Sequence, residues 1–280
     1  MPHRPRPYPS DLSDARWGLL EPTLTAWRAE RRGKGLDIGR PPEHDLRRIM
    51  DGILYVDRTG IPWRYLPNDF APRETVYEYF AAWQKDSVID QLNGLLRRLV
   101  REAAGRDVEP SACVLDAQSI KSSANVPAAG QGLDAGKKTA GRKRHIGVYT
   151  AGPLLAVLVT AASVSDNVGG IHLLSGIAES HPRVAKAWAD SDYRTKAIDH
   201  GATLGVDVDV TRGDPAQKDF RVIPRRWVVE RTFGWPMHHR RLARDYESHP
   251  HRSEDMIKVA MVDLMSRRLA RESTPNWRDS

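Results

Sequence analysis

The sequence has a single cysteine, Cys113, among its 280 residues. One thiol excludes a disulfide framework and any zinc site built from cysteines, and it suits a reducing compartment. Long apolar runs are also lacking: the longest, residues 154–159, is far shorter than the ~18 residues of a membrane helix. The N-terminal residues carry charge but no apolar signal segment. These absences predict a cytoplasmic protein without a membrane segment.

Acidic residues are outnumbered by basic ones, 36 against 43, which gives a formal net charge of +7. Only ten of the basic residues are lysine, so 33 are arginine. The planar guanidinium group suits phosphate recognition better than the point charge of lysine. This composition favours a nucleic-acid partner. The alternative is a coding bias of a GC-rich genome, since alanine, glycine and proline are also frequent.

Residues 1 to about 110 carry the periodicity of short helices. The clearest stripe has apolar side chains at the helical spacing i, i+3, i+4, i+7 and i+8: Leu46, Ile49, Met50, Ile53 and Leu54. Similar stripes occur within residues 76–83 and 88–99, with proline and glycine turns between the stripes. Three or four helices of this kind suit either a helix-turn-helix-like DNA-binding unit or a helical cap on the rest of the protein.

Beyond residue 110 short apolar strands alternate with helices. The pattern predicts a strand that ends at Asp116, a hairpin over residues 146–159, a strand that ends at Asp190, and a strand over 206–210. Helices are expected over residues 171–177 and 195–204, with a long basic amphipathic stretch from Pro224. Residues 125–144 show no apolar periodicity and are expected to form a loop. The order predicts a mixed α/β sheet.

Three carboxylates stand out by position. Asp116 and Asp190 follow short apolar strands, and the strand ends of an α/β sheet are where ligands bind. Glu230 lies on the helix expected after Pro224, which could bring it beside them. Each carboxylate also has a structural explanation: the aspartates can cap turns, and Glu230 can pair with a neighbouring arginine. Position alone leaves both interpretations open.

The sequence motifs around these carboxylates are more specific than their positions. Five motifs occur in order: GIPWRYLP at 60–67, VLDAQSIK at 114–121, ADSDY at 189–193, RRWVVERTF at 225–233 and RRLARDYE at 240–247. Together they resemble the DDE transposases of bacterial insertion sequences, in the group with an N-terminal helical module. The resemblance runs from about Tyr8 to Arg271 and so covers nearly the whole chain.

The resemblance implies an α/β fold: a ribonuclease-H-like mixed-sheet catalytic domain over residues 111–280, preceded by an all-helical, DNA-end-binding module over residues 1–110. It implies Asp116, Asp190 and Glu230 as catalytic residues and ligands of two Mg²⁺ or Mn²⁺ ions. Such cations prefer oxygen ligands and can activate the attacking oxygen while they stabilise the leaving one. The implied activity is binding of terminal inverted repeats, DNA cleavage and strand transfer by a nucleoid-associated protein.

Basic residues near the carboxylates are expected to contact the backbone of double-stranded DNA from the element ends and the target. They are Lys121, Lys143, Arg144, Arg226, Arg231, Arg240, Arg241 and Arg244. A solvated basic face is the alternative. His238 and His239 are adjacent, and adjacent side chains on a helix do not face one metal. The last helix, over 256–269, is expected to pack in the core, with a homodimer face as the second interpretation.

Three residues depart from the family pattern: Asp192, Pro236 and Met237. Proline inside the helix of Glu230 removes a backbone hydrogen bond, so we expect a bend or break between Trp235 and Met237 that re-aims the arginines beyond it. By the same reasoning, Pro236→Leu should stabilise the protein by ~1–3 kcal/mol. These departures support a second hypothesis, a catalytically decayed copy that only binds DNA. A ribonuclease-H-like nuclease or resolvase is a third, disfavoured because it needs no end-recognition module.

Overall fold

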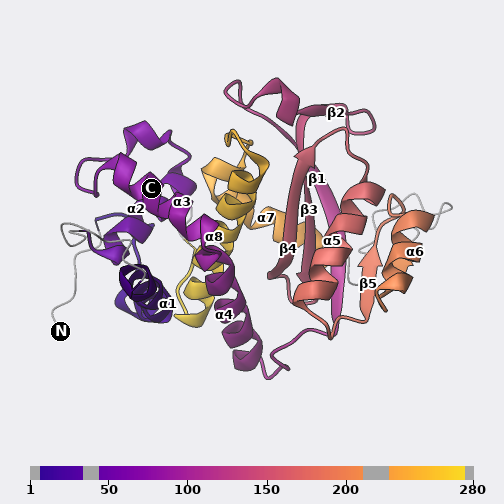
Figure 1. The fold of residues 1–280 in the computed structure, drawn as a ribbon, viewed down its shortest axis with the longest axis horizontal. Helices are drawn as coiled ribbons and strands as arrows, with labels where there is room; N and C mark the ends of the chain where they lie inside the picture. Colours follow the sequence, from indigo (N-terminus) through magenta and orange to yellow (C-terminus); the bar gives the residue numbers. More distant parts are fainter. Residues whose placement is uncertain (1–6, 34–43, 211–226, 275–280) are drawn as a thin grey trace. The chain divides into compact units, whose positions relative to one another are not determined.

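The computed structural model describes residues 7–33, 44–210 and 227–274 (Figure 1). The chain forms two compact units. The helical unit contains residues 1–105, 238–241 and 258–280, and the sheet unit contains residues 106–237 and 242–257. Within the described ranges, no helix is both long enough and apolar enough to span a membrane.

The helical unit contains the three helices that the apolar stripes predict: α2 (Leu46–Thr59), α3 (Arg73–Lys85) and α4 (Val88–Ala103). It also contains α1 (Asp14–Gly33), which no stripe predicts, and a 3₁₀ turn at Trp63–Tyr65. The stripe on α2 is buried, and the side chain of Asp45 caps the helix by accepting from the backbone N–H of Arg47. Gly60 ends α2 in the left-handed conformation, at φ 74°, where glycine carries no steric penalty.

The second half of the last helix, α8 (Pro250–Leu269), belongs to the helical unit. This differs from the expectation that residues 111–280 form one domain. The physical reason is a buried charge: Asp263 accepts from Arg16 of α1 at 2.5 Å and from Arg267 at 3.1 Å. A buried carboxylate needs such partners, so α8 is tied to α1. Met256, Met261 and Met265 are buried, as core packing requires.

The sheet unit contains a mixed six-stranded sheet in the order β2-β3-β1-β5-β6, with β4 also paired to β3. Its strands are β1 (Ala112–Lys121), β2 (Gly132–Asp134), β3 (Thr139–Tyr149), β4 (Leu154–Ala161), β5 (Lys186–Ala189) and β6 (Asp207–Val210). The β1–β3, β2–β3 and β3–β4 pairs are antiparallel, whereas β1–β5 and β5–β6 are parallel. The expected mixed α/β sheet is confirmed.

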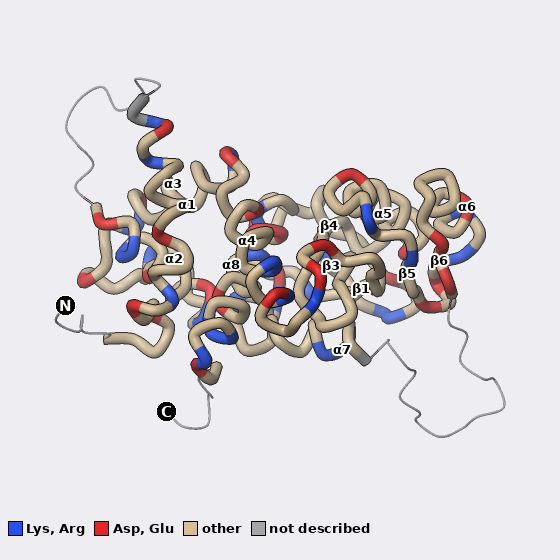
Figure 2. Tube along the Cα trace, turned by 90° about the horizontal axis from the view of Figure 1, so that it is seen from below, with Lys and Arg blue, Asp and Glu red and all other residues tan. Residues whose placement is uncertain are grey.

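Helices cover both faces of this sheet. α5 (Asp166–Ser180) and α6 (Thr195–Thr203) lie on one face, and α7 (Trp227–Gly234) packs against β1 on the other. Figure 2 shows the same separation from below. Cys113 and Leu115 of β1 belong to the core beneath α5 and α6. Because alternate residues of a strand point to opposite faces, Asp116 points to the α7 face.

One expectation about this region is wrong. Residues 125–144 are not a loop throughout: they include β2 and the start of β3, and β1 continues five residues past Asp116. The basic side chains of β3 hide this strand from an apolar pattern. The helix expected to carry Glu230 is α7, described from Trp227, which ends at Gly234, and Pro236 begins a 3₁₀ turn. The break expected near Pro236 is therefore confirmed.

Candidate active site

Asp116 lies on β1, and Asp190 directly follows the neighbouring parallel strand β5, which ends at Ala189. The register of β1 and β5 pairs Ala112 with Lys186 and Val114 with Trp188. Asp116 and Asp190 each lie two residues beyond the last of these pairs. The register is therefore consistent with two neighbouring carboxylates at the carboxyl end of β5.

The turn that follows β5 holds Asp190 in a defined orientation. One carboxylate oxygen of Asp190 accepts from the backbone N–H of Asp192 at 2.9 Å, and its carbonyl accepts from the N–H of Tyr193 at 3.2 Å. Tyr193 is fully buried. Burial raises the pKa of Tyr193 well above its ordinary value, and the negative charges of Asp116, Asp166 and Asp190 raise it further. The charges of both candidate aspartates therefore affect the pKa of this one phenol.

Glu230 lies within α7, on the side of the sheet to which Asp116 points. The Thr232 hydroxyl lies 2.9 Å from the carbonyl oxygen of Gly152, and Arg231 donates to the carbonyl of Ala151 at 3.0 Å. These contacts fix α7 against the turn between β3 and β4. The side chain of Glu230 and the whole of Arg226 lie outside the described residues.

The chemistry of the two aspartates fits a hard divalent cation. Within the ranges that the structure describes, no group of three histidine, cysteine or acidic side chains is arranged to hold a metal ion. Asp116 and Asp190 supply two carboxylates at one edge of the sheet, and carboxylate oxygens are the ligands that Mg²⁺ and Mn²⁺ prefer. A third carboxylate on α7 would complete such a site.

Three of the basic residues expected to bind DNA are buried. Lys143 forms ion pairs with Asp166 at 2.8 Å and Asp134 at 3.2 Å. Arg144 donates to the carbonyl of Leu242 at 2.8 Å, and Arg241 donates to the carbonyl of Ile61 at 3.1 Å. Each of the three is at most 7% exposed. Their charges are used inside the protein, which disfavours a phosphate contact.

The other described members of that set reach solvent. Lys121, Arg240 and Arg244 are exposed, and they remain the candidates for contacts with DNA backbone. Arg231 is half-buried, with its guanidinium carbon 5.0 Å from the centre of the Trp235 ring. Because α7 ends at Gly234, Arg240 does not continue the helical face on which Glu230 lies.

Sequence reasoning missed a buried polar cluster under the first turn of α5. Its centre is Lys143, and its other members are Ser119, Asp134, Asp166 and His145. Burial alone would lower the pKa of Lys143, but its ion pairs outweigh burial and raise that pKa. Burial lowers the pKa of His145 to about 4, so the imidazole is neutral at pH 7. No periodic signal marks these residues, because charged residues usually indicate a surface.

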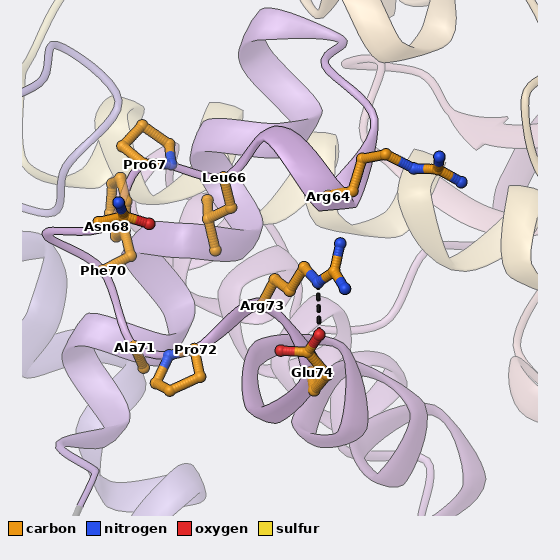
Figure 3. Close-up of a pocket in the computed structure, with 9 residues that line it drawn as sticks. All are labelled: Arg64, Leu66, Pro67, Asn68, Phe70, Ala71, Pro72, Arg73 and Glu74. Carbon is orange, nitrogen blue, oxygen red and sulfur yellow. Dashed lines mark hydrogen bonds and ion pairs between the residues drawn. The ribbon is translucent and has the colours of Figure 1, made fainter.

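The helical unit has an open groove of about 450 Å³ beside the GIPWRYLP motif (Figure 3). Trp63 packs against Phe80 with ring centroids 5.5 Å apart. Arg64 extends on the same side as the guanidinium of Arg73. Arg73, however, is paired with Glu74. The groove therefore carries mixed charge and does not by itself define a phosphate site.

A mixed sheet with helices on both faces and aspartates at two neighbouring parallel strands defines a ribonuclease-H-like domain of the DDE class. Comparison with known proteins gives the family. Residues 108–264, more than half of the chain, match the transposase DDE domain, and residues 12–93 match the IS4/5 family of transposases. The chain therefore belongs to the DDE transposases.

One curated relative agrees with this assignment. The "Insertion element IS402 uncharacterized 16.2 kDa protein" of Burkholderia cepacia is 31% identical over 112 residues. The match covers 39% of this chain and 72% of the relative.

Proposed function

We propose that this chain binds the terminal inverted repeats of its insertion element and catalyses metal-dependent cleavage and strand transfer of double-stranded DNA. Asp116, Asp190 and Glu230 are the catalytic carboxylates in this proposal. The observation that carries it is the parallel pairing of β1 with β5: Asp116 and Asp190 each lie two residues beyond the last pair, Val114 and Trp188. Contacts with phosphates come from the exposed Lys121, Arg240 and Arg244 and from Arg226.

Each carboxylate has a role that its position supports. Asp116 lies mid-strand in β1, where β3 pairs Ile146 with it, and β5 pairs with the same strand up to Val114. Asp190 is oriented by the turn to Asp192. Two Mg²⁺ or Mn²⁺ ions, when bound, would supply activation of the attacking oxygen and stabilisation of the leaving oxygen. The three carboxylates would hold those ions, and the basic residues would orient the phosphodiester.

Three isosteric variants test the proposal: Asp116→Asn, Asp190→Asn and Glu230→Gln. Each should abolish Mg²⁺- or Mn²⁺-dependent cleavage of DNA that carries an element end, while end binding in a mobility-shift assay stays nearly intact. Removing two carboxylates should cost little more than removing one, because residues that act as a unit are non-additive. Asp199→Asn is the matched control, since Asp199 is an exposed aspartate on α6 of the same unit.

A variant of the three that keeps more than a few per cent of the activity would exclude that residue as an essential ligand. The decayed-copy hypothesis remains the alternative, supported by Asp192 and by the exposed Met237. It predicts that the wild-type chain binds end DNA and cuts none of it with either metal. The break near Pro236 also agrees with that alternative, because the arginines beyond the 3₁₀ turn do not continue the helix that carries Glu230.

A further inference from the structure

The first turn of α5 is attached to the centre of the sheet. Ser165 caps the helix by accepting from the N–H of Val168 at 3.3 Å. Asp166, which is 7% exposed, is paired with Lys143 of β3 at 2.8 Å. Gly169 lies against His145, where an added Cβ would come within 2.1 Å of the imidazole ring. These contacts hold the turn at a fixed place over the strand that pairs with Asp116.

The same turn also holds the segment that follows Asp190. The side-chain oxygen of Asn167 accepts from the backbone N–H groups of Arg194 and Ala197, both at 3.2 Å. These N–H groups belong to the start of α6, and Arg194, the N-cap of this helix, makes no capping bond with its own side chain. Asn167 therefore caps α6 from a different helix, which satisfies donors that a helix N-terminus leaves unpaired.

A close packing contact reinforces this attachment. Gly170 lies against the ring of Tyr193, and an added Cβ would come within 2.6 Å of it. Tyr193 is fully buried, and its N–H donates to the carbonyl of Asp190. Residues 190–194, which we call the Asp190 turn, are thus fixed at one end by β5 and at the other by Asn167.

We infer that Asn167 is a positioning residue for Asp190: by capping α6 it sets the conformation of the Asp190 turn, and with it the direction of the Asp190 carboxylate relative to Asp116. The inference rests on the proposed function, because it assumes that the two carboxylates act together on a metal ion. Residues that orient metal ligands in this indirect way commonly change metal affinity or activity by 10–100-fold when they are replaced.

The test uses the full-length protein and Mn²⁺ alone as the probe, with binding followed by electron paramagnetic resonance. Asn167→Ala removes the acceptor and should weaken Mn²⁺ binding by about tenfold or more. Asn167→Asp keeps an oxygen at the same place and should restore most of the affinity. Val168→Ala is the matched control, since Val168 lies in the same turn and is 46% exposed. Asp190→Asn shows which part of the binding uses this site.

Hydrogen exchange separates positioning from a purely structural role. In Asn167→Ala the amides of Arg194 and Ala197 should exchange faster, because they lose their acceptor. Faster exchange or a lower melting temperature with unchanged Mn²⁺ affinity would overturn the inference, as would a wild-type chain that binds no Mn²⁺. A wild-type chain whose Mn²⁺ binding depends on Asp190 and Asn167, but which cuts no end DNA, would refute the proposed function and support the positioning role.

Discussion

Replacing Lys143 with methionine should destabilise the sheet unit by about 3–5 kcal/mol, the usual cost of removing one partner from a buried ion pair. The lysine is 5% exposed and lies between Asp134 and Asp166, at 3.2 and 2.8 Å. Methionine retains the apolar stem but leaves two buried carboxylates without their cation. For a unit of this size the loss corresponds to a fall in melting temperature of roughly 10 °C.

Calorimetry and urea unfolding of the full-length variants would measure this loss. Lys121→Met is the matched control: Lys121 ends β1 on the strand next to Lys143 but is exposed, so its replacement should change stability by no more than about 0.5 kcal/mol. Adding Asp166→Asn to Lys143→Met should cost less than the sum of the single changes, because the two residues share an interaction.

The opposite result would refute the reasoning. Lys143→Met could instead be as stable as Lys121→Met and bind end DNA much more weakly than the wild type does. Lys143 would then serve as a phosphate contact, as its place in a basic run of the sequence suggests. If Lys143→Met lowers both stability and DNA binding, its DNA binding should recover under conditions in which the variant is again fully folded.

Two further predictions follow from the same sheet unit. Burial lowers the pKa of His145 from 6.5 to about 4, so the neutral imidazole stabilises the fold above pH 6.5. This stabilisation is lost as the pH falls toward 4, by at most about 3 kcal/mol. Urea unfolding of the wild type and of His145→Gln across this range should show a flatter pH profile for the variant. Pro236→Leu should change the unfolding free energy by less than about 1 kcal/mol, not by the ~1–3 kcal/mol expected for a proline inside a helix, because the first position of a 3₁₀ turn does not need the missing N–H. A gain of several kcal/mol by calorimetry would contradict this.

Much of the helical unit could be predicted from the sequence. The stripe on α2 repeats at helical spacing, and burying it requires no information from outside the segment. The sheet was harder to predict, because β3 contains Arg142, Lys143 and Arg144, a basic run that is typical of a surface. All three are buried, and Arg142 is paired with Asp245, 103 residues away. A charge can enter a core only beside its partner, and a local pattern does not reveal a partner so distant.

The candidate site divides in the same way. The sequence by itself predicted the two candidate aspartates, since each follows an apolar run in a specific motif, and it predicted a break of the helix near Pro236, since proline acts on its own neighbourhood. Only the tertiary structure decided that β1 and β5 are neighbouring parallel strands, that Asn167 caps a helix to which it does not belong, and that Asp263 joins α8 to Arg16 across 247 residues. Backbone preference is a local property, whereas register, capping between helices and charge burial depend on which distant segments meet.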